Sequence, residues 1–124
     1  LEEKKLPNGI HLQKITVPLG VVAAIFESRP NVVADIAALC LKSRNACVLK
    51  GSRDADNTNK AIVKIIHTIL KQHQLPPQLV LLLPPQREVV NELFTATKYI
   101  DVIIPRGSNS LIQYVRKNSL VPVI

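Results

Sequence analysis

A basic turn at residues 50–53 carries the side chains of this sequence that best suit binding chemistry: Lys50, Gly51, Ser52 and Arg53. Lys supplies a compact positive charge and Arg a planar fork of donors, and both suit a phosphate group. The turn follows the apolar run 46–49, which is typical of a buried strand. Open α/β sheets bind ligands at the carboxyl ends of their strands, so these side chains could hold a ribose and its 2′-phosphate. A solvated basic turn is the alternative.

A second candidate is the turn that begins with Gly107 and Ser108, because it opens a predicted helix directly after the apolar run 102–104. The free N–H groups and positive dipole end of a helix N-terminus attract phosphate. The glycine fingerprint G-x-G-x-x-G and the P-loop motif are both absent, so a nucleotide would have to bind through such a helix end. The alternative is an ordinary turn with a Ser cap.

Asn31 is the third candidate, since it follows a proline and precedes the apolar stretch 32–42. Its side-chain oxygen can cap the predicted helix while its NH₂ group points toward the carboxyl edge of the sheet. Such a donor suits the stabilisation of a developing oxyanion. A purely structural cap is the alternative.

The sequence gives little support for a catalytic or metal site built from its cysteines and histidines. Cys40 lies inside the predicted apolar helix and Cys47 inside a predicted buried strand, where thiols stay protonated, so we predict core residues and not nucleophiles. The three histidines lack a Ser or Cys partner pattern. No spacing typical of a metal site is present, and we predict no metal.

The elements that position these residues alternate along the chain. Apolar runs predict strands at 21–26, 46–49, 79–83, 102–104 and 121–124. Helical patterns fall between them, at 31–42, 58–73, 87–95 and 110–117. The order predicts a three-layer, Rossmann-like α/β fold, with a parallel sheet of about five strands and helices on both faces. The helix at 31–42 is almost wholly apolar, so we expect it to be largely buried.

The amino-terminal residues form a separate stretch. Residues 1–6 are a polar lead-in, and Pro7, Asn8 and Gly9 give a strong turn signal. Residues 11–17 alternate loosely, which predicts an exposed strand that approaches the first core strand.

Composition excludes several classes of protein. The net charge of +7 is spread along the 124 residues without a basic cluster or interleaved aromatics, so we predict no nucleic-acid partner. Solvated faces explain the charge, with an anionic ligand or acidic partner as the alternative. No apolar run reaches the ~18–20 residues of a membrane span. Without a disulfide framework we expect a cytoplasmic protein. The start without Met and the apolar end suggest part of a longer protein.

Several segments resemble one known family. They are VPLGVV at 17–22, FESRPNV at 26–32, LCLK at 39–42 with Asn45 and Ala46, KYID at 98–101, IPRG at 104–107 and VPVI at 121–124. In this order and spacing the chain is similar, from about Leu6 to its end, to the γ-glutamyl phosphate reductase (glutamate-5-semialdehyde dehydrogenase) family of the aldehyde dehydrogenase superfamily.

The resemblance implies NADPH-dependent reduction of L-glutamyl 5-phosphate to L-glutamate 5-semialdehyde with release of phosphate, a step of proline biosynthesis. It assigns Asn31 to the oxyanion hole and Lys50 to the adenine ribose, with Gly51 and Ser52 in the same cofactor-binding turn. Many NAD-using relatives have Glu at the position of Arg53, so Arg53 favours NADP. Gly107 and Ser108 match the start of the pyrophosphate-facing helix.

The resemblance also marks what this chain lacks. The family's catalytic Cys lies downstream of the segment similar to 121–124, and neither Cys40 nor Cys47 matches it. We therefore expect residues 1–124 to form one incomplete NADP-binding domain, inactive alone, of a longer homo-oligomeric enzyme with glutamate 5-kinase as a further partner. The alternatives are another aldehyde dehydrogenase-like enzyme, such as a bifunctional pyrroline-5-carboxylate synthetase, and a non-enzymatic basic α/β binding module.

Overall fold

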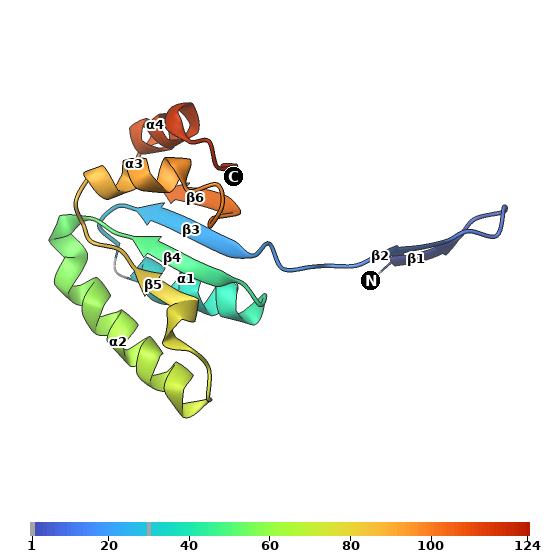
Figure 1. Cartoon of the computed structure of the whole chain (residues 1–124), viewed down its shortest axis with the longest axis horizontal. Helices are drawn as coiled ribbons and strands as arrows, with labels where there is room; N and C mark the ends of the chain where they lie inside the picture. Colours follow the sequence, from blue (N-terminus) through green and yellow to red (C-terminus); the bar gives the residue numbers. More distant parts are fainter. Residues whose placement is uncertain (1, 30) are drawn as a thin grey trace.

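A four-stranded parallel sheet forms the centre of the protein in the computed structural model, which describes residues 2–29 and 31–124 (Figure 1). Its strands, in spatial order, are β5 (Val80–Leu82), β4 (Ala46–Lys50), β3 (Val21–Phe26) and β6 (Val102–Arg106). The predicted parallel α/β fold is confirmed. The expected fifth strand at 121–124 is reduced to a single parallel bridge between Ile103 and Val123.

Strand β3 lies between β4 and β6 and is buried on both faces. Val22, Ala24 and Phe26 belong to the core on one side of the sheet, and Ala23 and Ile25 to the core on the other. Successive side chains of a strand point to opposite faces, so an unbroken apolar run is what a doubly covered strand requires.

Helices cover both faces of the sheet. Helices α1 (Asn31–Lys42) and α2 (Asp56–Gln72) pack on one core, while α3 (Glu88–Thr95) and α4 (Asn109–Asn118) pack on the other. Short 3₁₀ turns, η1 (Arg53–Ala55) and η2 (Pro77–Leu79), precede α2 and β5. None of the helices in the described ranges is long and apolar enough to cross a membrane.

The expectation that the helix at 31–42 is largely buried is wrong. Only one face of α1 is covered, by Val32, Val33, Ala37 and Cys40. Leu39, on the outer face, has 67% of its surface exposed. The helix is apolar on more sides than the sheet can cover, because a single helix presents only one stripe to the sheet beneath it.

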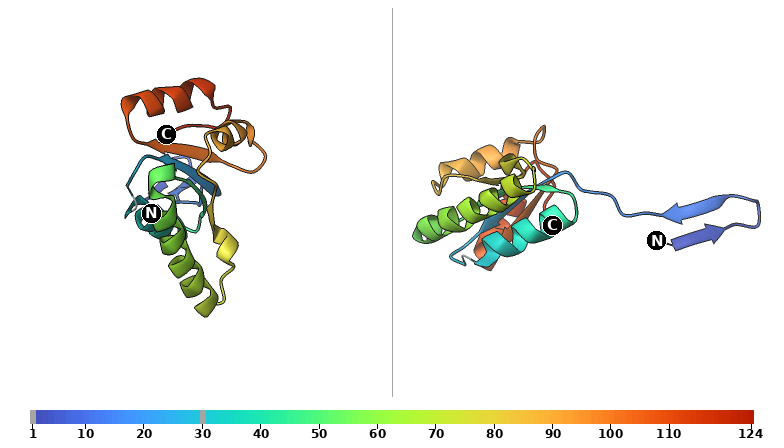
Figure 2. Two further views of the ribbon diagram at one scale, coloured as in Figure 1. Left: turned by 90° about the vertical axis from the view of Figure 1, so that its left-hand side faces the viewer. Right: turned by 90° about the horizontal axis from the view of Figure 1, so that it is seen from below.

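The amino-terminal segment forms a hairpin that reaches away from the sheet (Figure 2). β1 (Glu2–Lys5) pairs antiparallel with β2 (His11–Lys14), and Gly9 takes the predicted turn with a φ of +87°. The polar lead-in is thus a strand, and β2 pairs with β1 and not with the core. Two polar segments separated by a tight turn satisfy each other's backbone hydrogen bonds without needing an apolar face.

The amino ends of three strands are joined by polar side chains. Gly20 N–H donates to Asn45 Oδ1 at 2.9 Å, and Val21 N–H donates to Asp101 Oδ2 at 2.8 Å. Gly20 has a φ of +116° and a Cβ there would collide with the Asp101 carboxylate, so glycine is required. These contacts hold β3, β4 and β6 in register, which fixes the positions of their opposite ends.

Candidate functional site

The carboxyl ends of the strands surround a cavity of about 1080 Å³. Its polar lining comes from four segments: Glu27 after β3, Lys50 at the end of β4 with Ser52 to Asp54 after it, Arg87 and Glu88 before and at the start of α3, and Ser110 on α4. The predicted turn at 50–53 therefore lies in a cavity at the carboxyl edge, where it was expected. The binding roles of its residues stay predictions.

Lys50 is a buried cation held by backbone carbonyls. Only 6% of its surface is exposed, and its Nζ donates to Gly51 O at 3.0 Å and Pro85 O at 2.9 Å. Burial, and secondly the positive charge of Arg87, lower the pKa of Lys50, while Glu88 acts in the opposite direction. A solvated turn is thus excluded for this residue. An ammonium group has three donors, so one stays available to a ligand.

Gly51 is needed because its neighbours are closely packed. A Cβ at this position would lie 3.1 Å from the Phe26 ring and would collide with the side-chain amide of Asn59. Asn59 is itself 1% exposed, and its Oδ1 has no hydrogen-bond partner among the described residues. Ser52 Oγ lies 3.0 Å from Ser28 Oγ, which joins the turns that follow β4 and β3.

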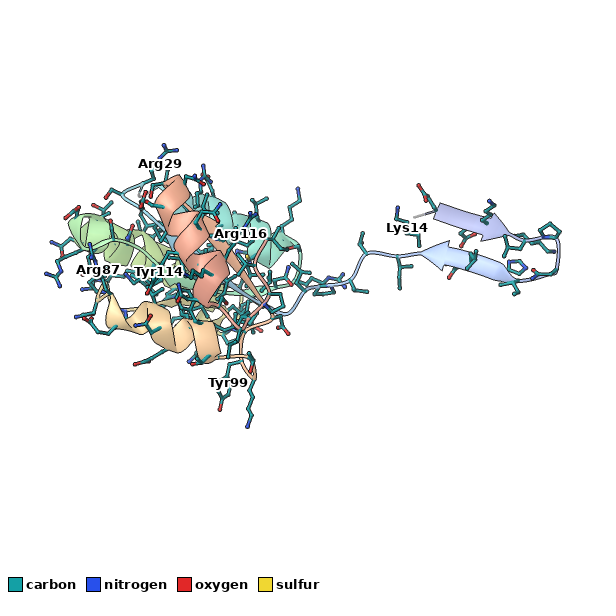
Figure 3. The ribbon with its side chains drawn as sticks, turned by 90° about the horizontal axis from the view of Figure 1, so that it is seen from above. Lys14, Arg29, Arg87, Tyr99, Tyr114 and Arg116 are labelled. Carbon is teal, nitrogen blue, oxygen red and sulfur yellow. The ribbon has the colours of Figure 1, made fainter. Side chains whose placement is uncertain are left out.

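Two guanidinium groups face the same cavity. Arg53 follows β4 and Arg87 directly precedes α3, and both side chains are exposed. Within residues 2–29 and 31–124, neither group forms a hydrogen bond or an ion pair. Figure 3 shows Arg87 at the beginning of α3, with Tyr114 on the neighbouring α4.

The cavity also has an apolar wall, made by Val90 of α3 and by Leu111 and Tyr114 of α4. Tyr114 is fixed there, because its hydroxyl donates to Asn91 Oδ1 at 3.3 Å and its ring centroid lies 5.7 Å from that of Phe94. Flat apolar groups such as nucleotide bases suit a wall of this kind, beside the basic turn.

The turn at Gly107 and Ser108 holds a carboxylate from the protein itself. Glu27 accepts hydrogen bonds from Ser108 N–H at 2.8 Å and from Ser108 Oγ at 2.9 Å. A Cβ on Gly107 would lie 2.6 Å from Glu27 Oε2, so glycine permits this approach. Ser108 also caps α4 by accepting from Leu111 N–H at 3.3 Å, as in the alternative of an ordinary Ser cap. The N-terminus of α4 is thus an anion site with Glu27 in it.

Asn31 lies apart from this cavity lining. It is the first residue of α1 and is exposed, so it occupies the first turn and not the cap position that the sequence suggested. The preceding Pro30 is outside the described residues. Asn31 Nδ2 donates to Asp35 Oδ2 at 3.4 Å. Its oxyanion role stays a prediction.

The two cysteines are buried, as predicted, in the core between the sheet and the α1–α2 layer. The neighbouring Cys40 side chain, as a hydrogen-bond partner, and secondly burial raise the pKa of the Cys47 thiol, which therefore stays protonated. The Cys47 side chain in turn lowers the pKa of Cys40. Neither side chain lines the cavity at the carboxyl edge.

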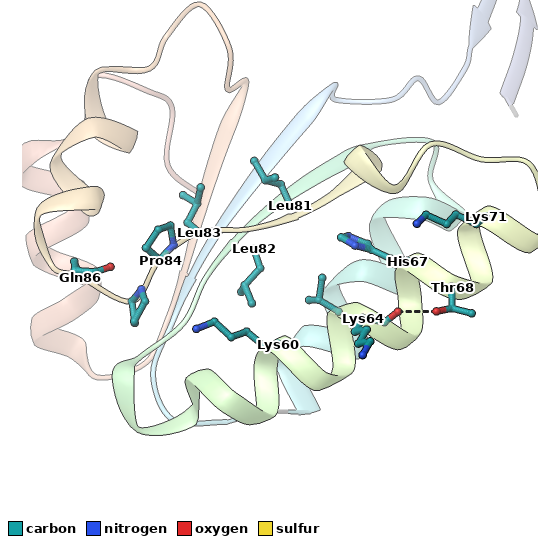
Figure 4. A pocket seen from close by; sticks show the side chains of 12 residues that line it. Lys60, Lys64, His67, Thr68, Lys71, Leu81, Leu82, Leu83, Pro84 and Gln86 are labelled. Carbon is teal, nitrogen blue, oxygen red and sulfur yellow. Dashed lines mark hydrogen bonds between the residues drawn. The ribbon is translucent and has the colours of Figure 1, made fainter.

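A second cavity, of about 630 Å³, lies between α2 and the edge strand β5 (Figure 4). Lys60, Lys64 and Lys71 of α2 line it opposite Leu81 to Gln86. His67 Nε2 lies 2.7 Å from Val80 O, so this side chain satisfies a backbone carbonyl at the open edge of the sheet. No residue that the sequence singled out for binding lies in this cavity.

The aldehyde dehydrogenase family model matches residues 1–122. The chain belongs to the aldehyde dehydrogenase family. Similar curated proteins are the γ-glutamyl phosphate reductases of Pelodictyon phaeoclathratiforme, 56% identical, and Bacteroides fragilis, 54% identical. Both matches cover 100% of this chain and 30% of the relative, so the chain spans about a third of their length.

Solved structures of a reductase and a dehydrogenase share this fold. A γ-glutamyl phosphate reductase from Thermotoga maritima has a TM-score of 0.91 and 38% identity over 99% of this chain and 30% of its own. The glyceraldehyde-3-phosphate dehydrogenase GapN of Methanocaldococcus jannaschii, solved with NADP, has a TM-score of 0.71 and 23% identity over 86% of this chain and 24% of its own. The second likeness shows the fold alone.

Proposed function

We propose that this chain is the cofactor-binding part of a cytoplasmic, NADPH-dependent γ-glutamyl phosphate reductase. The enzyme reduces L-glutamyl 5-phosphate to L-glutamate 5-semialdehyde with release of phosphate, in proline biosynthesis. The observation that carries this proposal is similarity over all 124 residues, at 52–56% identity, to curated relatives with that name. The cavity at the carboxyl edge supports it independently, because its lining combines cations with an apolar wall.

The residues present fit an adenine dinucleotide. The remaining donor of Lys50 would bind the adenine ribose, and the guanidinium of Arg53 would bind its 2′-phosphate. The wall at Leu111 and Tyr114 would bind the base. NADPH, when bound, supplies the hydride for the reduction. Ser108 would donate to the pyrophosphate only after its hydrogen bonds to Glu27 are released.

Asn31 would act on the substrate side of the same edge. Its amide currently donates to the Asp35 carboxylate at 3.4 Å, which is a long hydrogen bond. A rotation of the exposed side chain would free this donor for a developing oxyanion. Asn31 lies at the N-terminus of α1, where the helix dipole also favours negative charge.

A cofactor titration tests the proposal. The full-length protein is titrated with NADPH and with NADH, following nicotinamide fluorescence. We expect tighter binding of NADPH, and loss of this preference in Arg53→Glu, because a carboxylate repels the 2′-phosphate. Arg116→Glu, on the outer surface of α4, makes the same charge change outside the cavity and should keep the preference. Equal binding of NADPH and NADH by the unaltered protein would contradict NADPH dependence.

A further inference from the structure

Arg87 is brought to the basic turn by a specific backbone contact. The Pro85 carbonyl accepts a hydrogen bond of 2.9 Å from Lys50 Nζ, and Pro85 precedes Arg87 by two positions. The segment that leads into α3 is therefore fastened to the end of β4. Two proline residues, Pro84 and Pro85, further restrict the backbone of this segment.

Three positively charged side chains, Lys50, Arg53 and Arg87, line the same cavity and repel one another. Arg87 is close enough to Lys50 to lower its pKa, and Arg53 is three positions after Lys50 in the same cavity. Glu88 offsets part of this charge at Lys50. Like charges that line one cavity repel one another unless an anion is bound between them.

The two guanidinium groups have no ion-pair or hydrogen-bond partner among residues 2–29 and 31–124. In the described part of the chain, neither Asp54 nor Glu88 forms an ion pair with Arg53 or Arg87, although both carboxylates line the same cavity. The Lys50 ammonium, by contrast, is already engaged with two carbonyls. The guanidinium groups thus have all their donors open to a doubly charged ligand group, whereas Lys50 has one donor left.

We propose that Arg87 is a second specificity-determining residue, which binds the ribose 2′-phosphate together with Arg53 from the neighbouring strand end. Arg53 follows β4 and Arg87 follows β5, so the phosphate is held between two adjacent turns. A phosphate offers enough acceptor atoms for both planar forks, and a charge-assisted bond of this kind is stronger than a neutral one. The inference rests on the proposed function, because it requires an adenine dinucleotide in this cavity.

The test uses two nucleotides that differ only in the 2′-phosphate, adenosine 2′,5′-bisphosphate (2′,5′-ADP) and adenosine 5′-monophosphate (5′-AMP), whose binding to the full-length protein is measured by calorimetry. We expect Arg87→Gln to weaken the binding of 2′,5′-ADP about tenfold or more and the binding of 5′-AMP less than about twofold. Arg116→Gln is the matched control, since it removes the same group from the exposed surface of α4 outside the cavity. It should leave both affinities unchanged.

The outcomes separate the two proposals. If the unaltered protein binds neither nucleotide, the proposed function fails and this inference fails with it. If it prefers 2′,5′-ADP and Arg87→Gln keeps that preference, Arg87 is not a phosphate ligand, while the proposed function stands. If Arg87→Gln does not fold, Arg87→Lys replaces it. Lysine keeps the charge but not the fork, so an unchanged preference in Arg87→Lys also overturns the inference.

Discussion

Two turns at the same edge of the sheet differ in what they offer a ligand. The turn at 50–53 lies at the end of β4 and presents the exposed guanidinium of Arg53 beside the anchored ammonium of Lys50. The turn at 107–110 follows β6 and presents the N–H and the hydroxyl of Ser108, but both already donate to Glu27. Strand β3 lies between the two strands and supplies Glu27 to the second turn only.

This difference shows that a helix N-terminus attracts negative charge from any source, including the chain itself. Glu27 stabilises the turn at 107–110 while no other anion is present, and it competes with a phosphate for the same donors. The turn at 50–53 has no such internal ligand within the described ranges, so its positive charge stays directed at the cavity. The turn at 50–53 can bind an anion directly, whereas the turn at 107–110 must release the Glu27 carboxylate before it binds a phosphate.

The largest effect should come from the glycines of the two turns. Gly51→Ala places a Cβ against the buried Phe26 ring and Asn59, which cannot move aside, and should destabilise the fold by about 2 kcal/mol. Gly107→Ala meets only the exposed Glu27 carboxylate, which can rotate away, and should cost at most about 1 kcal/mol. Urea unfolding of both variants measures the difference. Equal costs would mean that the two turns are equally packed.

Removing the Glu27 carboxylate should leave the turn at 107–110 open to an anion, as the turn at 50–53 is. Glu27→Ala leaves the Ser108 donors free, and we expect a loss of about 1 kcal/mol of stability, because a charged partner at a helix N-terminus is lost. Inorganic phosphate should then raise the melting temperature of Glu27→Ala more than that of the unaltered protein.

The control for this experiment is Glu92→Ala, which removes an exposed carboxylate from α3 outside the cavity. Its response to phosphate should match that of the unaltered protein. If Glu27→Ala and Glu92→Ala respond alike, the α4 N-terminus does not bind phosphate in exchange for Glu27.

The smallest effect concerns the titration of Lys50. Its pKa is lowered from 10.5 in the folded state, so between the folded pKa and 10.5 the unfolded chain holds more protons. Stability therefore rises with pH through this window, as the burial penalty of the charged amine is relieved. Lys50→Met should remove this rise, which unfolding midpoints at successive alkaline pH values measure.

The neighbours of Lys50 should move this pKa in opposite directions. Glu88→Gln lowers it further, because a negative charge that favours the ammonium is lost, and Arg87→Gln raises it, because a repelling charge is lost. Isotope-edited NMR of reductively methylated protein can follow the Lys50 amine in each variant. Shifts of the same sign in both variants would contradict this charge arrangement.

Much of the sheet could be predicted from the sequence because its strands are unbroken apolar runs. A run such as 21–26 has no polar face, so burial on both sides is the one arrangement that suits it. The predicted core strands and helices lie within two residues of their observed bounds, except the strand predicted at 121–124, which is only a single bridge. The turn of the hairpin and its second strand were predicted, but β1 was missed. Backbone pairing alone holds the polar residues of β1, and such pairing leaves no periodic pattern in the sequence. The exposure of Leu39 was missed because composition does not show which helix face the sheet covers.

The candidate site was predictable as a location but not as a set of contacts. Strands in parallel bring their following turns to one edge, which placed Arg53 and Ser108 together in the prediction. The contact of Glu27 with Ser108 joins residues 81 positions apart, and it depends on β3 lying beside β6. The segment with Arg87 has no motif of its own. It reaches the site because the Pro85 carbonyl accepts a hydrogen bond from Lys50 Nζ.

The position of β3 at the centre of the sheet also determines when the site can form during folding. Its contact with the β4 side spans 25 positions, between Gly20 and Asn45, whereas its contact with the β6 side spans 80, between Val21 and Asp101. Closing the longer loop costs more chain entropy, so we expect β3, α1 and β4 to assemble first and β6 to join later. The turn with Lys50 and Arg53 is then formed before α4 exists to close the cavity. The folding chain thus acquires its cationic wall early and the Glu27–Ser108 contact last.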